Sequence, residues 1–338
     1  MKKIVIIVTL CTSLLLGCAT PKNEFSVVEG AMLGTSLRIV ADIKIQPAEL
    51  YAAVMELDTR FKAEMSLFDP ASQLSRINRG ESDSLTEGII YNLHLSDSVS
   101  RISGGKYDVT VAPLVKAFGF GSKEEQIEKP NVDSILQFVG YQKISVEGSR
   151  LIRQDPRTQI DLNSIAKGYI VDMVAQRVAQ AGAENYMVDI GGEITCKGSN
   201  AQGNPWRIGI ESPFDGNMSN GEYIQKRIAI PKESPLRAMA TSGNYRRFHM
   251  DENGNKIAHT IDPITGSSKI SSLLSATVIA PNCALADAYG TMFMALGSER
   301  AIEVAERITD AEVYFIFDDL AGGYKEYFSD GMVGFVME

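Results

Sequence analysis

The stretch QIDLNSIAKGYIVDMVAQRVAQAGAENYMVDIGG, residues 159–192, holds a strand, a helix and a second strand in one run. A short strand leads to a predicted helix cap at Asn163 or Ser164. An apolar stripe at helical spacing follows and stops at Gly182. The apolar segment after it predicts a buried strand that ends in a turn at its two glycines. This stretch predicts a helix packed between strands.

Outward from this stretch, strands and helices mix without a regular βαβ rhythm. Upstream we expect a hairpin over 26–45, helices over 47–65 and 86–103, a short helix from Asn131 to Gly140, and a hairpin over 143–160. Downstream we expect short strands over 206–278, helices over 283–297 and 299–308, a strand over 312–317, and a terminal hairpin. The helix over 86–103 should bury Ile89, Ile90, Leu93 and Ile102. The mixture predicts an α+β fold, and the length allows one large domain or two smaller ones.

The N-terminus, MKKIVIIVTLCTSLLLGCAT, has two lysines before an apolar run over 4–16, which is too short for a comfortable membrane span. It ends in Leu-Leu-Gly-Cys, which resembles the lipobox of bacterial lipoproteins, in which Cys18 would become a lipidated N-terminus. We therefore expect a signal peptide over 1–17, a lipidated linker over 18–25 and a domain over 26–338. This domain would lie outside the cytoplasm, lipid-anchored to a membrane of a bacterial cell envelope. The alternative is an ordinary signal peptide with an incidental cysteine.

Composition excludes several classes of protein. The 338 residues carry a net charge of −9, and no run of Lys and Arg exceeds two residues, which argues against a nucleic-acid surface. With only His94, His249 and His259, a multi-histidine zinc site is improbable, so a metal would be a hard cation on oxygen ligands. Once the leader is removed and Cys18 lipidated, Cys196 and Cys283 remain, and we expect free, buried thiols rather than a disulfide.

The stretch CALADAYGTMFMALG, residues 283–297, reads as an apolar helix with two polar residues in its middle. Asp287 and Thr291 are four residues apart, so they share one helical face. A carboxylate and a hydroxyl suit Mg²⁺, and the small Ala286 and Gly290 would let a ligand approach the backbone. The alternative is structural: Asp287 would complement the dipole of its own helix while Thr291 bonds back to a carbonyl.

The segment DLNSIAKGY is a second candidate site. Asp161 ends a strand, Ser164 lies at a helix start and Lys167 lies in the first turn. Free amides and a cation at this place make a phosphate cradle, although a solvated lysine is the plainer explanation. A lysine in a first turn opposes the helix dipole and therefore requires a compensating anion.

Two further segments hold candidate residues. In HTIDPITG, His259 precedes a turn, where it is either a general base or a packing histidine. In SLFDP and GGKYDV, Phe68 and Tyr107 stand beside acidic turn residues, where an aromatic side chain could stack on a flat ring or belong to the core.

The order of these motifs resembles the ApbE family of FAD:protein FMN transferases, once called thiamine biosynthesis lipoproteins. The resemblance runs from residue 31 to 297 through LGTSL, SLFDPASQLSRIN, GGKYDVTVAPLVKAFGFG, IDLNSIAKGYIVDMVA, YMVDIGGEI, PWRIGIESP, ATSGNY, HTIDPITG and TVIAPNCALADAYGTMFMALG. It implies one α+β domain of the T-fold-like ApbE type around an FAD cleft.

The resemblance also implies roles for individual residues. Mg²⁺ would be held by Asp287 and Thr291, completed by Ser164 and Gly290, and His259 would be catalytic. Flavin and phosphate contacts would fall on Met32, Leu33, Phe68, Lys106, Tyr107, Asp108, Asp161, Lys167 and Ile261. Two departures stand out: Gly191-Gly192-Glu193 where the family commonly has Asp or Asn third, and AMLGTSL where Met-Gly-Thr is usual. The second leaves the choice between Met32 and Leu33 open.

The activity implied is transfer of FMN from FAD to a Ser or Thr hydroxyl of an acceptor protein, with release of AMP. Acceptors of the family include flavin subunits of membrane redox complexes. Two alternatives stay open. One is a Mg²⁺-dependent FAD pyrophosphatase that gives FMN and AMP, and the other is a lipoprotein that binds flavin without catalysis.

Overall fold

The computed structural model describes residues 24–121, 131–214, 223–245, 248–250, 256–258, 260–268, 271–319 and 321–337. The predicted signal peptide over 1–17, the predicted lipidation site Cys18 and the predicted catalytic His259 lie outside these residues. Within the described ranges, no helix joins the length and the apolar character that crossing a bilayer requires.

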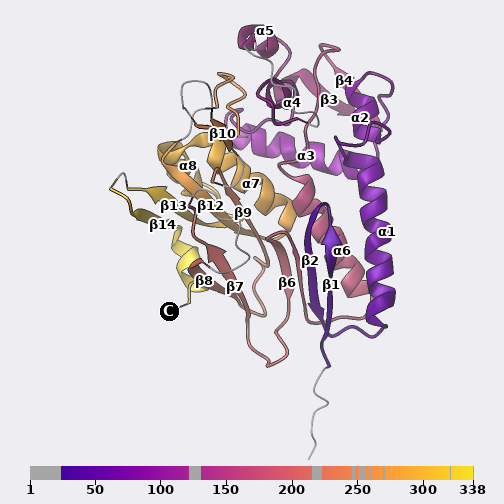
Figure 1. Ribbon diagram of the computed structural model, residues 1–338, viewed down its shortest axis with the longest axis vertical. Helices are drawn as coiled ribbons and strands as arrows, with labels where there is room; N and C mark the ends of the chain where they lie inside the picture. The colour runs from indigo at the N-terminus through magenta and orange to yellow at the C-terminus, as the bar shows by residue number, and fades with distance from the viewer. Residues whose placement is uncertain are drawn as a thin grey trace, which may run out of the picture.

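An antiparallel sheet of eight strands dominates the described part of the chain (Figure 1). Its strands, in spatial order, are β1 (Ser26–Met32), β2 (Thr35–Ala41), β5 (Tyr186–Ile190), β6 (Glu193–Lys197), β9 (Ala238–Gly243), β12 (Leu273–Ala280), β13 (Glu312–Asp318) and β14 (Tyr324–Phe328). Three hairpins stand apart from it: β3 (Ile144–Glu147) with β4 (Arg150–Arg153), β7 (Trp206–Glu211) with β8 (Ile224–Ile230), and β10 (Phe248–Met250) with β11 (Lys256–Ala258).

The helices pack mainly on one face of this sheet. They are α1 (Pro47–Met65), α2 (Gln73–Asn78), α3 (Glu87–Ile102), α4 (Ala112–Ala117), α5 (Val132–Leu136), α6 (Ala166–Gln180), α7 (Cys283–Leu296) and α8 (Ser298–Ala305), with 3₁₀ turns at Tyr141–Lys143 and Asp330–Phe335. Figure 1 shows α6 beside α1, with α7 next to it over the sheet.

The alternation of side chains along each strand divides the core into two layers. Val313 and Phe315 of β13 join the large cluster with the helices, whereas Tyr314 and Ile316, which alternate with them, join the cluster under β7 and β8. A strand turns successive side chains to opposite faces, so the sheet is covered by helices on one side and by the β7–β8 hairpin on the other.

The expected α+β fold is confirmed, as are most of the predicted elements. Thr86 and Asn131 cap α3 and α5, accepting from the amides of Ile89 at 3.3 Å and Ser134 at 3.0 Å. Cys196 and Cys283 are free and buried, as expected.

Four details of the prediction are wrong. In place of the short strand expected before α6, Gln159 forms only an isolated bridge with Val111. Helix α6 follows Ile165 with no side-chain cap, because Ser164 donates its hydroxyl to the Tyr107 oxygen at 2.9 Å instead of capping the helix. Helix α5 ends at Leu136, before Gly140. Ile102 is exposed at the last position of α3 instead of buried.

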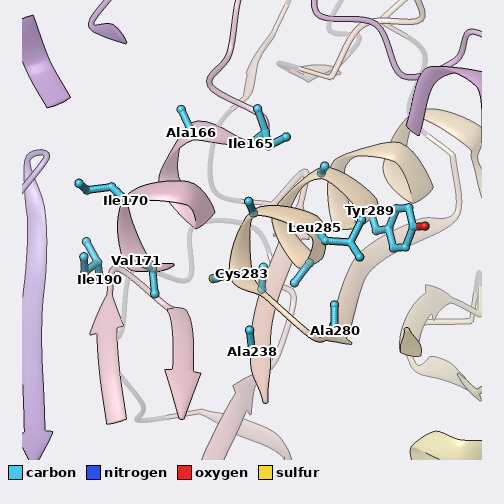
Figure 2. Close-up of a cluster of buried hydrophobic side chains, with 14 of the residues drawn as sticks. Ile165, Ala166, Ile170, Val171, Ile190, Ala238, Ala280, Cys283, Leu285 and Tyr289 are labelled. Atoms are coloured by element: carbon cyan, nitrogen blue, oxygen red, sulfur yellow. The ribbon is translucent and has the colours of Figure 1, made fainter. Parts of the chain in front are cut away.

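Helices α6 and α7 approach very closely where they cross. A Cβ added at Gly168 would lie 2.2 Å from the carbonyl oxygen of Cys283, so only glycine fits there. Figure 2 shows apolar side chains of both helices in one buried cluster, with Val171 from α6 and Cys283 and Leu285 from α7. Their close packing fixes the position of α7 relative to the start of α6.

Candidate functional site

A cleft of about 810 Å³ runs between the sheet and the β7–β8 hairpin and reaches the start of α6 and the middle of α7. The pairing of the strands explains why the sheet is open at this cleft. In the described chain β6 pairs with β9 only through Ile194 with Met239 and Thr195 with Ala238. The other ends of these strands carry Glu193 and Thr241, both of which line the cleft. The helices behind the sheet therefore contribute side chains to the cleft at this point.

Asp287 lies in the cleft wall with 5% of its surface exposed. Its Oδ2 accepts a hydrogen bond from the Gly168 amide at 2.9 Å, whereas among the described residues no donor bonds its Oδ1. Burial raises the pKa of this carboxyl group, and Lys167 and the Gly168 amide partly offset the effect. One oxygen of Asp287 is thus fixed by α6 while the other remains available to a ligand.

Neither part of the structural alternative for Asp287 and Thr291 is observed. The start of α7 is capped by Asn282, which accepts from the Leu285 amide at 2.9 Å, and Asp287 lies beyond the first turn. In the described structure Thr291, which also lines the cleft, makes no side-chain hydrogen bond back to its helix. Asp287 instead places its charge at the start of α6, where a helix favours an anion.

Asp172 likewise places its carboxylate at the start of α7. Its two carboxylate oxygens accept from the amides of Cys283 and Ala284, each at 2.9 Å, and the Thr195 hydroxyl donates to it at 3.2 Å. Each of the two helices therefore carries a carboxylate that binds the N-terminal amides of the other. The crossing is held by polar contacts at both ends and by the Gly168 contact between them.

Lys167 pairs with Glu193 inside the cleft. The Nζ of Lys167 lies 2.6 Å from Oε2 of Glu193, an ion pair that lacks the alignment of a hydrogen bond. Burial raises the pKa of Glu193 to about 8, against the lowering effect of Lys167. Burial alone would lower the pKa of Lys167, but Glu193 and Asp287 outweigh it and the pKa is raised. When ionised, Glu193 is the compensating anion that a first-turn lysine requires.

The loop around Tyr107 packs against the segment that leads into α6. The buried Tyr107 hydroxyl accepts from Ser164 at 2.9 Å and lies 3.4 Å from the Ser96 hydroxyl, and burial raises its pKa. The Asp161 amide donates to the Val109 carbonyl at 2.7 Å, which joins the two loops. Tyr107, Asp161 and Ser164 are therefore neighbours.

Lys106 and Asp262 form an ion pair that connects this loop to the turn after His259. Asp262 also accepts from the Ile264 amide at 2.9 Å and the Thr265 hydroxyl at 2.8 Å. Burial would raise the pKa of Asp262, but these partners outweigh it and lower the pKa. Ile261 is buried in a small separate cluster with the side chains of α4 and α5.

The other predicted contacts are dispersed. Met32 is a core residue, 1% exposed, and Leu33 has a positive φ of 52° in the β1–β2 turn. Asp108 points inward and accepts from the Thr110 amide and hydroxyl and from the Tyr141 amide, while burial raises its pKa. Gly290 lies against β9, where an added Cβ would be 2.8 Å from the Ser242 hydroxyl.

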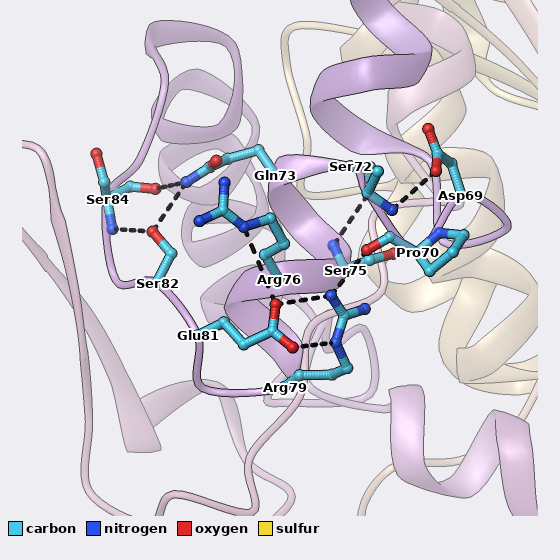
Figure 3. A network of polar contacts seen from close by, with 11 residues as sticks. Asp69, Pro70, Ser72, Gln73, Ser75, Arg76, Arg79, Glu81, Ser82 and Ser84 are labelled. Atoms are coloured by element: carbon cyan, nitrogen blue, oxygen red, sulfur yellow. Dashed lines mark hydrogen bonds and ion pairs between the residues drawn. The ribbon is translucent and has the colours of Figure 1, made fainter.

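Phe68 is 63% exposed on the loop between α1 and α2. Figure 3 shows the polar network that orders the chain after it, in which Ser72 caps α2 by accepting from the Ser75 amide at 3.0 Å. Arg79 closes the network on Glu81 with two hydrogen bonds, at 2.7 and 2.8 Å. The exposed ring thus stands on a well-anchored loop.

The structure therefore brings Lys167, Asp287 and Thr291 together on one cleft wall. Sequence reasoning did not assign roles to Glu193 or Asp172, which hold Lys167 and α7 in place. A usable signal for Glu193 was an acidic residue directly after a Gly-Gly turn, at the end of a buried strand. No local signal marked Asp172, which sits in an ordinary helical pattern.

Comparison with known proteins gives one consistent answer. Residues 33–315 match the ApbE family. The FAD:protein FMN transferase of Vibrio cholerae is 34% identical over 96% of both chains, and that of Haemophilus influenzae is 32% identical over 94% of this chain and 93% of its own.

Solved structures agree. The flavin transferase ApbE from Vibrio cholerae superposes with a TM-score of 0.79 at 31% identity, covering 92% of this chain and 99% of its own. The ApbE protein from Thermotoga maritima gives a TM-score of 0.80 at 25% identity, covering 93% of this chain and 100% of its own. The chain, matched over nearly all of its length in sequence and in structure, belongs to the ApbE family.

Proposed function

We propose that this chain is a Mg²⁺-dependent enzyme that moves FMN from FAD to a Ser or Thr hydroxyl of an acceptor protein and releases AMP. The observation that carries the proposal is the cleft wall, where Lys167, Asp287 and Thr291 meet in a space of about 810 Å³. The relatives named FAD:protein FMN transferase match this chain almost from end to end.

The charge of the cleft supports a divalent cation. Its described lining includes the carboxyl groups of Glu29, Asp189, Glu193, Glu211 and Asp287 and the cations of Arg38, Lys167 and Arg207. With Glu193 protonated below its pKa of about 8, the other four carboxyl groups still outnumber the three cations. A substrate with a diphosphate would meet an excess of negative charge, which a bound cation would reverse.

The available oxygen atoms fit Mg²⁺. Among the described residues no three acidic, histidine or cysteine side chains form a metal cluster. Mg²⁺ commonly takes only one or two carboxylates and fills its shell with water and substrate phosphates. Asp287 Oδ1 and the Thr291 hydroxyl would bind it. The resemblance adds Ser164 and Gly290 to this set. When bound, it would neutralise the diphosphate and orient it for displacement.

Side chains and amides of the chain would bind the phosphates and the flavin and accept the proton. Lys167 and the first amides of α6 would bind phosphate oxygens, because a helix start favours anions. Lys106, Tyr107 and Phe68 would hold the flavin end. The acceptor hydroxyl oxygen attacks the phosphorus of the FMN half, the bond from that phosphorus to the bridging oxygen breaks, and AMP leaves with that oxygen. The hydroxyl proton passes to a base, a role that the resemblance gives to His259.

We also propose that Cys18 is lipidated and holds the domain at a bacterial envelope membrane, outside the cytoplasm. An anchored enzyme would meet acceptors that are membrane-bound, such as flavin subunits of redox complexes. Labelling cells with an alkyne fatty acid tests this anchor, because Cys18→Ser should abolish the label and leave the protein in the soluble fraction.

The test of the activity uses the purified protein, FAD, MgCl₂ and a secreted or membrane protein of the same genome with an Asp-x-x-[ST]-[GS]-[AS]-[ST]-like segment. Acceptor-bound flavin, read as fluorescence in a denaturing gel, should form together with an equal amount of AMP, and a chelator should stop both. Free FMN with AMP but no bound flavin would replace the proposal by the pyrophosphatase. Tight FAD binding without AMP would replace it by a flavin-binding protein.

A further inference from the structure

Glu193 is a buried carboxylate in the reaction cleft to which no role has been given. It is 3% exposed, lines the same cleft as Asp287 and Thr291, and pairs with Lys167.

The backbone under Glu193 is rigid. Gly191 and Gly192 both have positive φ, 64° and 97°, and the Gly192 amide donates to Asp189 at 2.9 Å. An added Cβ on Gly191 would lie 2.6 Å from the Thr35 methyl group, so the turn is pressed against β2. Ile190 and Glu193 are paired across the β5–β6 hairpin. The carboxylate is therefore presented from a fixed point.

Lys167 comes from an equally fixed point. It precedes Gly168, whose amide is bound by Asp287 and whose Cα packs against Cys283. Its side chain nevertheless is 38% exposed and long enough to adopt many rotamers. In the described structure its one ion-pair partner within 4 Å is Glu193, with Asp287 also acting on its charge.

We propose, on the basis of the function proposed above, that Glu193 is a positioning residue that fixes the Lys167 ammonium beside Asp287 and tempers its attraction for the substrate diphosphate. Glu193 acts through Lys167 and does not itself bind the metal or the flavin. The fixed ammonium contacts the reacting phosphate in one geometry, which favours turnover. The carboxylate also places a negative charge near that phosphate, which weakens binding.

This role predicts opposite changes in binding and turnover. At pH 9, above the Glu193 pKa of about 8, Glu193→Gln removes one negative charge from the cleft and releases Lys167 to the ligand, so binding of a diphosphate should tighten about fivefold. Release of AMP at saturating FAD should fall about tenfold, because the ammonium is no longer held in one geometry. A merely structural residue would instead weaken binding, or lower stability, or both.

The experiment measures two quantities on the purified protein. The first is the Kd of inorganic pyrophosphate with MgCl₂ by calorimetry, which needs no turnover. The second is kcat and KM for AMP release from FAD. Glu193→Asp keeps the charge but is shorter, so it should bind pyrophosphate as the parent does while turnover falls. Glu303→Gln, which removes a carboxylate from the exposed pair with Arg307, is the matched control and should change neither quantity.

A double-mutant cycle tests whether Glu193 acts through Lys167. In a Lys167→Gln background, Glu193→Gln should no longer lower kcat. Weaker pyrophosphate binding by Glu193→Gln, an unchanged kcat, or an undiminished effect in the Lys167→Gln background would each overturn the proposal. Thermal unfolding checks that each variant is folded, and Glu193→Asp decides if the Gln variant is not. Absence of AMP release from the parent would overturn the proposed function, while the pyrophosphate measurements would still decide the role of Glu193.

Discussion

The candidate site has two parts that are built differently. The helix wall, formed by Lys167, Gly168, Asp287 and Thr291, lies on two crossing helices and is held by buried bonds to backbone amides. The loop corner, formed by Lys106, Tyr107, Ile261 and Asp262, lies on turns, and both side chains of its ion pair are 19% exposed. Changes in the wall should therefore affect fold and chemistry together, whereas changes in the corner should mainly affect substrate affinity.

Gly168→Ala should have the largest effect, because it should lower both stability and activity. Its Cβ would meet the Cys283 carbonyl, so the helices would have to separate, at a cost of about 2–3 kcal/mol in the free energy of unfolding. Urea unfolding measures this loss, and AMP release should fall with it. Gly334→Ala, which has no neighbour within 4 Å, is the control and should stay within about 0.5 kcal/mol of the parent. An unchanged midpoint for Gly168→Ala would show that the crossing is not tight.

Asp287→Asn should separate the two properties of the wall. The Asn side-chain oxygen can still accept from Gly168, so circular dichroism and Tm should match the parent. Losing the charged ligand should lower Mg²⁺-dependent turnover about 100-fold. Asp310→Asn removes a carboxylate that contacts Tyr289 on the same helix and should leave turnover unchanged. Parent-like activity of Asp287→Asn would exclude this residue as a metal ligand.

Asp262→Asn examines the loop corner. It weakens the pair with Lys106. The Asn oxygen can still accept from the Ile264 amide, and the Asn NH2, which replaces Oδ2, can donate to the Thr265 hydroxyl, so the free energy of unfolding should fall by no more than about 1 kcal/mol. KM for FAD should rise severalfold with kcat nearly constant, as steady-state kinetics would show. A drop in stability as large as that of Gly168→Ala would remove the distinction between wall and corner.

The smallest expected effect is the contribution of Glu193 to the pH dependence of stability. Its pKa is raised to about 8 in the folded protein by burial, from an ordinary value of 4.5. The folded state therefore keeps a proton that the unfolded state loses, and stability should decline as pH rises from about 4.5 to about 8. Between pH 5 and pH 8 the parent Tm should fall by roughly 2–5 °C more than that of Glu193→Gln. Parallel Tm profiles would show that the carboxylate is not desolvated.

The sequence predicted local features well and the effects of contacts between distant residues poorly. Asn131 caps its helix as expected, because a cap needs only the next three residues. Ser164 fails as a cap because its hydroxyl is bound by Tyr107, 57 residues earlier in the chain. Ile102 fits the apolar stripe of α3 yet lies at the last turn, where nothing packs over it in the described structure.

In the candidate site, too, local features were predictable from the sequence and contacts between distant residues were not. The spacing of Asp287 and Thr291 indicated their common face, and the structure places both in the cleft. The dipole argument indicated that Lys167 needs an anion but not which one. Glu193 reaches it only because the β5–β6 hairpin folds back beside α6, a long-range contact that no local pattern encodes.

The reciprocal contacts between α6 and α7 also limit how this gene can recombine with its relatives. Asp172 serves amides that lie 111 and 112 positions downstream, and Asp287 serves one 119 positions upstream. A chimera joined anywhere between Asp172 and Cys283 would take the two halves of this contact from different parents. Only parents that share the small residue, the two carboxylates and the same helix spacing would yield an active hybrid, so exchanges should succeed mainly upstream of residue 166 or downstream of 296.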